Sequence, residues 1–164
     1  MGALHKIGQM YAQGISTPKS CTAAVHAFKS VAERGPWVAG FSKAFNRHRM
    51  GDDMGALLNY IYLAEIGYEV AQSNAAFLLE EGLCGELNPT DCQRLAVRYY
   101  RLASKQNNAE ASLKVGDAYY YGKAGLTVDY ERAAKYYQTA AELRQAQAMF
   151  NLVRTYGVKG SVSE

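Results

Sequence analysis

The residues able to do chemistry in this chain are few and widely separated. About twenty residues lie between one histidine and the next, and no HExxH or CxxC spacing places two metal ligands on one helix face. The histidines are His5, His26 and His48. The sequence therefore predicts no metal site, and it offers no residue for binding a cofactor.

One stretch, "STPK" at residues 16–19, matches the Ser-x-x-Lys of penicillin-recognising enzymes. Neither Ser-Asp-Asn nor Lys-Thr-Gly follows it, and it falls in a predicted loop between helices, so we interpret it as a chance match. The adjacent Asp52 and Asp53 follow a glycine and precede a predicted helix, where acids favour the positive end of the helix dipole. We interpret them as capping residues. With no GxSxG, P-loop or GxGxxG motif either, the sequence predicts a protein that is not an enzyme.

The composition is that of one folded domain. The chain has 164 residues, of which 49% are apolar and 20% charged, and its net charge is +3. The basic residues are dispersed, which argues against a nucleic-acid partner, and no apolar run approaches the roughly 18 residues of a membrane span. No basic-then-apolar signal-peptide pattern precedes the first repeat, so we expect either an intracellular protein or a piece of a longer one. Thirteen tyrosines indicate many half-buried positions at which the ring packs and the hydroxyl stays polar.

The cysteines do not form a framework of disulfides. Cys84 and Cys92 could close the loop "CGELNPTDC" in an oxidising compartment, and both are expected between two helices. Cys21, next to a predicted helix start, is interpreted as a lone thiol.

A pattern of small residues repeats along the whole chain. Its origin alanines recur every 32 to 40 residues: Ala3, Ala39, Ala71, Ala111 and Ala148. Apolar residues at i+4, i+7 and i+8 predict an α-helical stripe from four of these origins. The four sets are Ala3, Ile7, Met10, Tyr11; Ala71, Ala75, Leu78, Leu79; Ala111, Val115, Ala118, Tyr119; and Ala148, Leu152, Thr155, Tyr156. The set from Ala39 is polar, so this helix is irregular or shifted onto Phe41, Phe45 and His48.

A second helical pattern follows each stripe. Gly14, Gly82 and Gly122 are predicted to end the first helix in a left-handed conformation. The next helix then alternates small and aromatic residues, with Phe28, Tyr60, Tyr99 and Tyr137 at equivalent positions, and a tight turn such as "ERGP" leads into the next unit. We predict an all-α fold, an α-α superhelix of stacked helix hairpins forming a single domain over residues 1–164. Its units are 1–35, 36–67 (irregular), 68–107, 108–144 and 145–164 (partial).

The stretch "ASLKVGDAYYYGKAGLTVDYERAAKYYQTAAE" at residues 111–142 carries a family resemblance. It resembles the Sel-one-like repeat, a relative of the tetratricopeptide repeat. The segments "VAERGPW", "GYEVAQSNAAF" and "AQAMFNL" are similar to the C-terminal repeats of the lumenal adaptor subunits of endoplasmic-reticulum-associated degradation (ERAD) ubiquitin ligases. The end "LVRTYGVKGSVSE" departs from the family pattern.

The resemblance implies a non-enzymatic adaptor on the lumenal side of the endoplasmic reticulum. Its partners would be a membrane RING ubiquitin ligase, lectin-type recruitment factors and misfolded clients, and it would meet the membrane only through partners or other parts of the protein. The alternative is a secreted or cytosolic adaptor of the same repeat family with another partner.

A mixed aromatic and polar strip is the predicted contact surface. In helix-hairpin solenoids the first helices line the binding face, which suits an extended peptide or a partner helix. The strip collects Ser73, Glu80, Leu113 and Phe150 together with the partner-binding candidates His5, Gln9, Phe77, Asp117, Tyr120 and Arg154. The alternative is a solvated surface with a few ordinary exposed aromatics.

Overall fold

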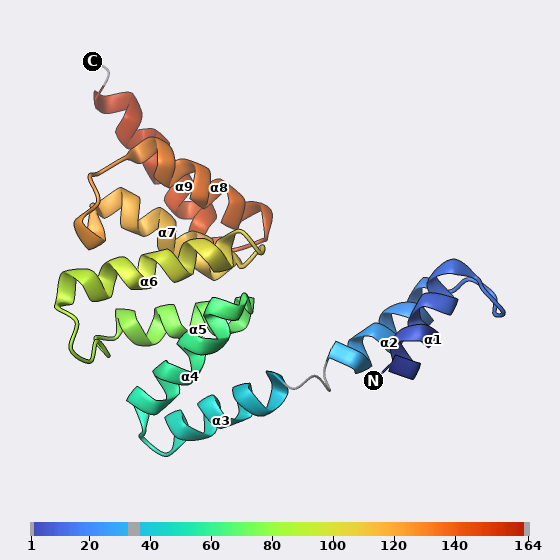
Figure 1. The fold of residues 1–164 in the computed structure, drawn as a ribbon. Coiled ribbons are helices and arrows are strands. Elements are labelled where there is room, and N and C mark those ends of the chain that lie inside the picture. Colours follow the sequence, from blue (N-terminus) through green and yellow to red (C-terminus); the bar gives the residue numbers. More distant parts are fainter. Residues whose placement is uncertain (1, 33–36, 163–164) are drawn as a thin grey trace. The chain divides into compact units, whose positions relative to one another are not determined.

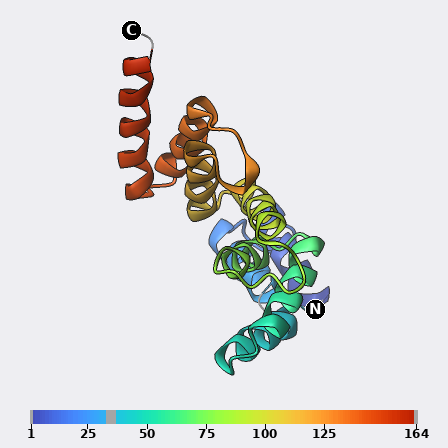
Figure 2. The same cartoon turned by 90° about the vertical axis from the view of Figure 1, so that its left-hand side faces the viewer.

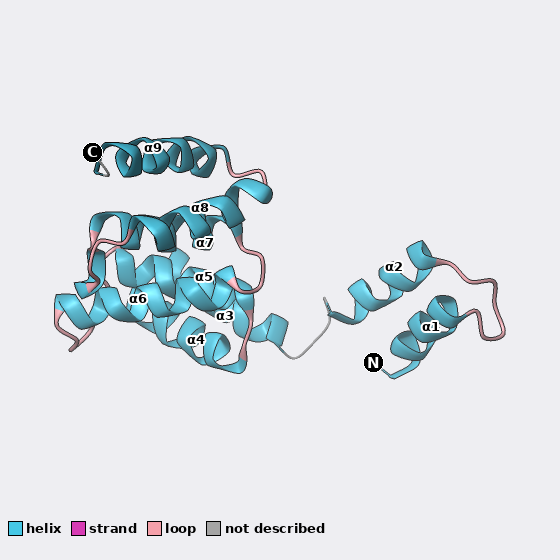
Figure 3. Ribbon diagram, turned by 90° about the horizontal axis from the view of Figure 1, so that it is seen from above, coloured by secondary structure: helices cyan, strands magenta, loops and turns pink. Residues whose placement is uncertain are grey.

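The computed structural model describes residues 2–32 and 37–162, and its described part contains helices and no strand (Figure 3). This confirms the all-α fold. The chain divides into two compact units, Met1–Ser42 and Lys43–Glu164, and each is taken by itself below. The organisation of all repeats as one domain stays a prediction.

The first unit contains one helix hairpin, α1 (Gly2–Gln13) packed on α2 (Cys21–Ala32) (Figure 1). Their contact is centred on Gly8, where a Cβ atom would lie 2.7 Å from the ring of Phe28. Ala3 is exposed and Ile7 is 41% exposed, so the predicted stripe of this helix is wrong in these two positions. Within this unit α1 packs on a single helix, which covers one narrow face. The predicted turn "ERGP" lies outside the described residues.

The second unit is a run of helices in which, from α4 to α9, each α-helix packs on the next in sequence (Figures 1 and 2). Its helices are α3 (Trp37–Arg49, which begins in the first unit), α4 (Asp53–Ile66), α5 (Glu69–Glu80), α6 (Pro89–Ser104), α7 (Ala109–Tyr121), the 3-10 turn η1 (Lys123–Gly125), α8 (Tyr130–Glu142) and α9 (Ala146–Val162). The helix starts predicted near Ala71, Ala111 and Ala148 are confirmed.

The alanine stripes of α5 and α7 form the core of this unit. The eight predicted positions are between 0% and 7% exposed: Ala71, Ala75, Leu78, Leu79, Ala111, Val115, Ala118 and Tyr119. In α9 the stripe is rotated, since Ala148 and Thr155 are buried but Tyr156 is 55% exposed and Asn151 is buried in its place. The α9 helix packs mainly on α8, so its buried face follows α8 and not the period from Ala148.

The irregular helix α3 buries a different face from the one expected. Ala44 is fully buried, whereas Ala39 is exposed and Phe45 is 54% exposed. The expected shift of the apolar face onto Phe41 agrees with the structure, because Phe41 is partly buried. The shift onto Phe45 and His48 is wrong, because the turn after Arg49 is short and fixes how α3 can rotate against α4.

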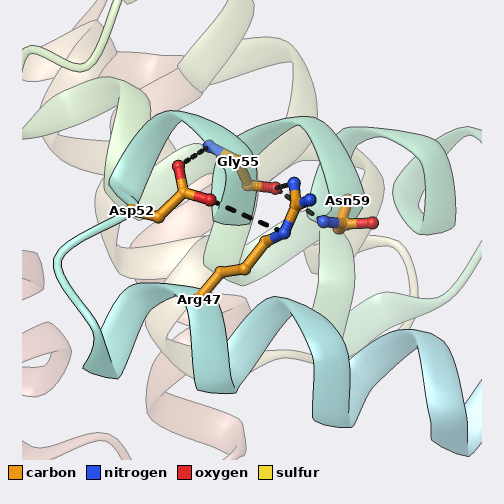
Figure 4. Close-up of polar contacts among 4 residues, drawn as sticks. All are labelled: Arg47, Asp52, Gly55 and Asn59. Atoms are coloured by element: carbon orange, nitrogen blue, oxygen red, sulfur yellow. Dashed lines mark hydrogen bonds and ion pairs between the residues drawn. The ribbon is translucent and has the colours of Figure 1, made fainter.

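That short turn is held by the polar contacts in Figure 4. Asp52 caps α4, its Oδ1 accepting from the backbone N–H of Gly55 at 2.9 Å, and its Oδ2 lies 3.6 Å from Nε of Arg47. Nη1 of Arg47 and the amide of Asn59 both donate to the carbonyl oxygen of Gly55. A Cβ at Gly55 would lie 2.2 Å from Oδ2 of Asp52, so only glycine leaves room for this arrangement. The capping role predicted for Asp52 is confirmed.

Glycines end the first helices as predicted. Gly14, Gly82 and Gly122 have φ angles of 75°, 93° and 66°, in the left-handed region that glycine adopts most easily. Polar side chains then join successive units: Asn108 donates to Glu69, and Gln145 donates to Glu110 at 2.7 Å. Each contact ties the start of one first helix to the start of the next.

Cys84 and Cys92 form a disulfide, with their Cα atoms 5.5 Å apart. Cys84 lies in the α5–α6 loop, as expected. Cys92 does not, because it lies in the first turn of α6 and is fully buried. Pro89 and the side-chain cap of Asn88 start the helix before Cys92 is reached, so the bridge fastens the loop to the helix. Cys21 is a free, exposed thiol, as predicted.

Candidate partner-binding surface

The candidate surface runs over the first helices of the second unit, α5, α7 and α9. Three of the predicted partner-binding residues meet there. The guanidinium of Arg154 lies 4.5 Å from the ring centroid of Tyr120 and donates from Nη2 to the hydroxyl of Tyr121 at 2.8 Å. Cation–π contact and hydrogen bond together hold α9 against α7.

Asp117 lies behind this contact and ties three helices together. Its Oδ1 accepts from the hydroxyl of Tyr137 on α8 at 2.6 Å and from Nδ2 of Asn151 on α9 at 3.3 Å. Because Tyr137 is fully buried, the carboxylate sits at the edge of the core. Asp117 is thus partly a structural residue, which its sequence position did not reveal.

Phe77 lies apart from Asp117, Tyr120 and Arg154, beside a cavity. It is 48% exposed and lines a cavity of about 310 Å³ together with Phe45, His48 and Tyr60. Nδ1 of His48 is 2.6 Å from Oδ1 of Asp53. Phe150 is 63% exposed, whereas Leu113 is 7% exposed and therefore does not belong to the surface.

His5 and Gln9 lie on α1 in the first unit. Both are exposed, and the ring of His5 lies 5.5 Å from that of Phe28. The two units are not placed relative to one another, so the structure brings neither residue together with the four candidates of the second unit. Their role in partner binding stays a prediction.

Tyrosine–carboxylate pairs between helices are the feature of the second unit that sequence reasoning missed. The hydroxyls of Tyr99, Tyr100 and Tyr137 donate to carboxylates at 2.7, 2.8 and 2.6 Å. The acceptors are Glu65, Glu80 and Asp117 respectively. The excess of tyrosine was a signal for such pairs, but it did not identify the partners, which lie on other helices.

Burial and these hydrogen bonds keep the three hydroxyls protonated. Burial, followed by the bond to Glu65, raises the pKa of Tyr99 to about 12. Burial and a carboxylate acceptor also raise the pKa of Tyr100 and of Tyr137. These contacts between helices are therefore made by neutral donors over the whole physiological pH range.

These shifts predict that the chain loses stability in alkali. An unfolded tyrosine releases its proton near pH 10, whereas folded Tyr99 keeps it until about pH 12, so the unfolded state binds fewer protons in between. The free energy of unfolding should fall from about pH 10 upward, and Tyr99→Phe should make this fall less steep. Urea unfolding at pH 9, 10 and 11 measures it. Tyr156→Phe, which removes an exposed hydroxyl, is the matched control, and equal slopes for both variants would contradict the prediction.

Further cations and rings surround the tyrosine run of α7. The guanidiniums of Arg101 and Arg132 lie 5.3 and 5.5 Å from the ring centroid of Tyr119, and Nη2 of Arg101 donates to its hydroxyl at 2.9 Å. The hydrogen bond to Tyr121 and nearby tyrosine hydroxyls raise the pKa of Arg154. These contacts give the surface an aromatic and cationic character suited to protein recognition.

Among residues 2–32 and 37–162, no three His, Cys, Asp or Glu side chains are grouped so as to hold a metal ion. The "STPK" stretch forms the exposed loop between α1 and α2, and Ser16 has a φ of 59°. Within the described part of the chain, each helix is too short or too polar to span a bilayer.

Stacked helix hairpins with an aromatic and polar strip along their first helices define a helical-repeat protein. The family model for the Sel1 repeat matches residues 2–35, 69–108 and 109–144. The chain belongs to the Sel1 repeat family.

Curated relatives are similar over most of the chain. Protein sel-1 homolog 2 of Rattus norvegicus is 43% identical over 139 residues, covering 84% of this chain and 20% of that protein. The ERAD-associated E3 ubiquitin-protein ligase component HRD3A of Arabidopsis thaliana is 42% identical over 128 residues, covering 73% of this chain and 19% of that protein. The chain thus spans about a fifth of the length of these relatives.

A solved structure supports the fold. A protective antigen of uropathogenic Escherichia coli displaying an SLR fold superposes with a TM-score of 0.62 at 24% identity, covering 94% of this chain and 33% of that one. At this identity the likeness concerns the fold alone.

Proposed function

We propose that this chain is a non-enzymatic scaffold segment of an adaptor subunit of an ERAD ubiquitin ligase. The observation that carries the proposal is the 42% identity to the plant ligase component HRD3A, which extends over 73% of the chain. Its partners would be the membrane RING ligase, lectin-type recruitment factors and misfolded clients. The surface of α5, α7 and α9, with Phe77, Asp117, Tyr120 and Arg154, is the proposed contact region.

The disulfide supports a location in the lumen of the endoplasmic reticulum. Disulfides persist in oxidising compartments and are rare in the cytosol. Cys92 is fully buried and its bridge fastens the α5–α6 loop to α6, so the bond belongs to the folded structure. A secreted protein would share this property, whereas a cytosolic adaptor would not.

A segment exchange tests the function. The part of HRD3A that matches this chain would be replaced by residues 1–164 in plant cells lacking their own HRD3A, and the half-life of a misfolded lumenal glycoprotein would be followed after translation is stopped. We expect the chimera to restore degradation and to co-precipitate with the RING ligase. Arg154→Glu in the chimera should weaken both, because it replaces the cation stacked on Tyr120 with an acid.

The control variant is Arg49→Glu, which changes an exposed cation at the end of α3 and should leave degradation intact. A chimera that is stable and enters the lumen but neither binds the ligase nor supports degradation would contradict the proposal. It would favour the alternative, a Sel1 repeat adaptor of another pathway. Turnover of nitrocefin by the chain would overturn the non-enzymatic function.

A further inference from the structure

The helix α9 buries polar residues and exposes apolar ones. Asn151 and Thr155, on the side packed against α8 and α7, are 5% and 0% exposed. The opposite side carries four large apolar side chains: Met149 (47% exposed), Phe150 (63%), Val153 (73%) and Tyr156 (55%). A surface helix normally has the reverse arrangement, with its polar residues toward water. The outer side of α9 is therefore suited to a protein contact.

These four side chains form one continuous face. At 3.6 residues per turn they span about 120° of the helix circumference. Figure 2 shows α9, in red, along one edge of the second unit. From residue 146 to residue 157 the sequence has one charged residue, Arg154, and its guanidinium lies 4.5 Å from the ring centroid of Tyr120 on α7. The outer face of α9 is therefore apolar and carries no charge of its own.

The repeat register shows that this face differs from those of the other first helices. In α1 and α7 a glycine lies five residues after the origin alanine and contacts an aromatic ring of the next helix. A Cβ at Gly8 would lie 2.7 Å from the ring of Phe28, and one at Gly116 would lie 2.6 Å from that of Tyr137. The same register position in α9 is Val153. Valine leaves no room for a ring at that distance, so this face fits a partner of another shape.

We propose that the outer face of α9 binds the same face of a second copy of this chain. The two α9 helices run antiparallel about a two-fold axis at Val153, so that both copies contribute the same surface. This arrangement sets Phe150 of one copy opposite Tyr156 of the other, and Met149 opposite Gly157. A Cβ at Gly157 would meet no atom within 4 Å, which leaves space beside it for the methionine.

Charge and area support a second copy as the occupant. Two identical faces without charge do not repel each other, and large side chains of one copy lie opposite a glycine of the other. Four half-exposed side chains of this size offer on the order of 400 Å² per copy, against roughly 800 Å² per partner in a stable interface. We therefore expect a weak dimer with a dissociation constant on the order of 100 µM. The dimer goes beyond the proposed function and does not depend on it.

Sedimentation equilibrium of the full chain tests the dimer. All variants carry Cys21→Ser, because the free thiol could otherwise link two copies. Between about 5 and 500 µM the mass should rise from 18.0 kDa toward twice that value. Val153→Asp should raise the dissociation constant at least tenfold, since it places two acids together at the axis. The matched control is Val25→Asp on α2, because Val25 is 64% exposed and its replacement should change the constant less than twofold.

Cross-linking tests the position of the axis. Val153→Cys should form a disulfide-linked dimer under mild oxidation at least five times faster than Val25→Cys, because the axis sets residue 153 beside its own copy. Equal rates of cross-linking, or equal effects of the two aspartate variants, would overturn the proposal. A chain that keeps a mass of 18.0 kDa at about 500 µM would overturn it as well, and would leave this face for a helix of a different protein.

Discussion

Replacing Gly116 with valine should lower the free energy of unfolding by about 3 kcal/mol. A Cβ atom at this position would lie 2.6 Å from both Cδ1 and Cε1 of Tyr137. The ring has no room to retreat, because Tyr137 is fully buried and its hydroxyl is bound to Asp117. Overpacking of this kind costs about 1 to 3 kcal/mol, and a branched side chain against a fixed ring falls at the upper end.

Gly157→Val provides the matched control. Gly157 also lies within a helix, α9, but a Cβ there meets no atom within 4 Å. Its replacement should change stability by less than about 0.5 kcal/mol. Urea unfolding at neutral pH compares the two variants, and equal midpoints would show that the ring of Tyr137 can move aside. Gly116→Val should also disturb the contacts of Asp117 with α9, and therefore the candidate surface.

The second large effect concerns the disulfide. Reduction of the bridge, or Cys84→Ser, should lower the free energy of unfolding by about 2.5 kcal/mol, the loop-closure entropy expected for a loop of about nine residues. Cys84 is chosen because Cys92 is fully buried, so that changing Cys92 would also alter the packing of α6. Urea unfolding with and without a thiol-free reductant measures the effect.

Cys21→Ser is the control for this experiment, because Cys21 is exposed and unpaired. The wild-type chain and Cys21→Ser should each gain two hydrogens in mass on reduction, and Cys84→Ser should gain none. If reduction adds the two hydrogens but leaves the unfolding midpoint unchanged, the bridge does not stabilise the fold. Such a result would remove the structural argument for an oxidising compartment, while the family relationship would remain.

The helices of this chain could be predicted from the sequence because their signals are local. The stripes from Ala71 and Ala111 repeat with the period of an α-helix, and both are buried as expected. Gly82 and Gly122 follow the ends of their helices with a positive φ, which glycine adopts easily because it has no Cβ, so a single residue carries this signal. The capping role of Asp52 depends on a backbone N–H only three residues away.

The candidate surface could be predicted only in part. The helical period places Phe77, Asp117, Tyr120 and Arg154 on first helices, and the structure brings the last three together. The same period failed for Leu113, which is buried. A helix in a stack has a neighbour on more than one side, and the sequence of that helix alone does not show how wide its covered face is.

The sequence by itself determined the class of this protein, a stack of helix hairpins, because small and aromatic residues at a helical period leave few other ways to bury them. The tertiary structure alone decided the pairs formed between helices. The hydroxyl of Tyr100 donates to Glu80 and that of Tyr137 donates to Asp117, each across a loop and a change of direction. The rotation of each helix about its own axis sets these partners. That rotation follows from the packing of all neighbours at once, and no local period encodes it.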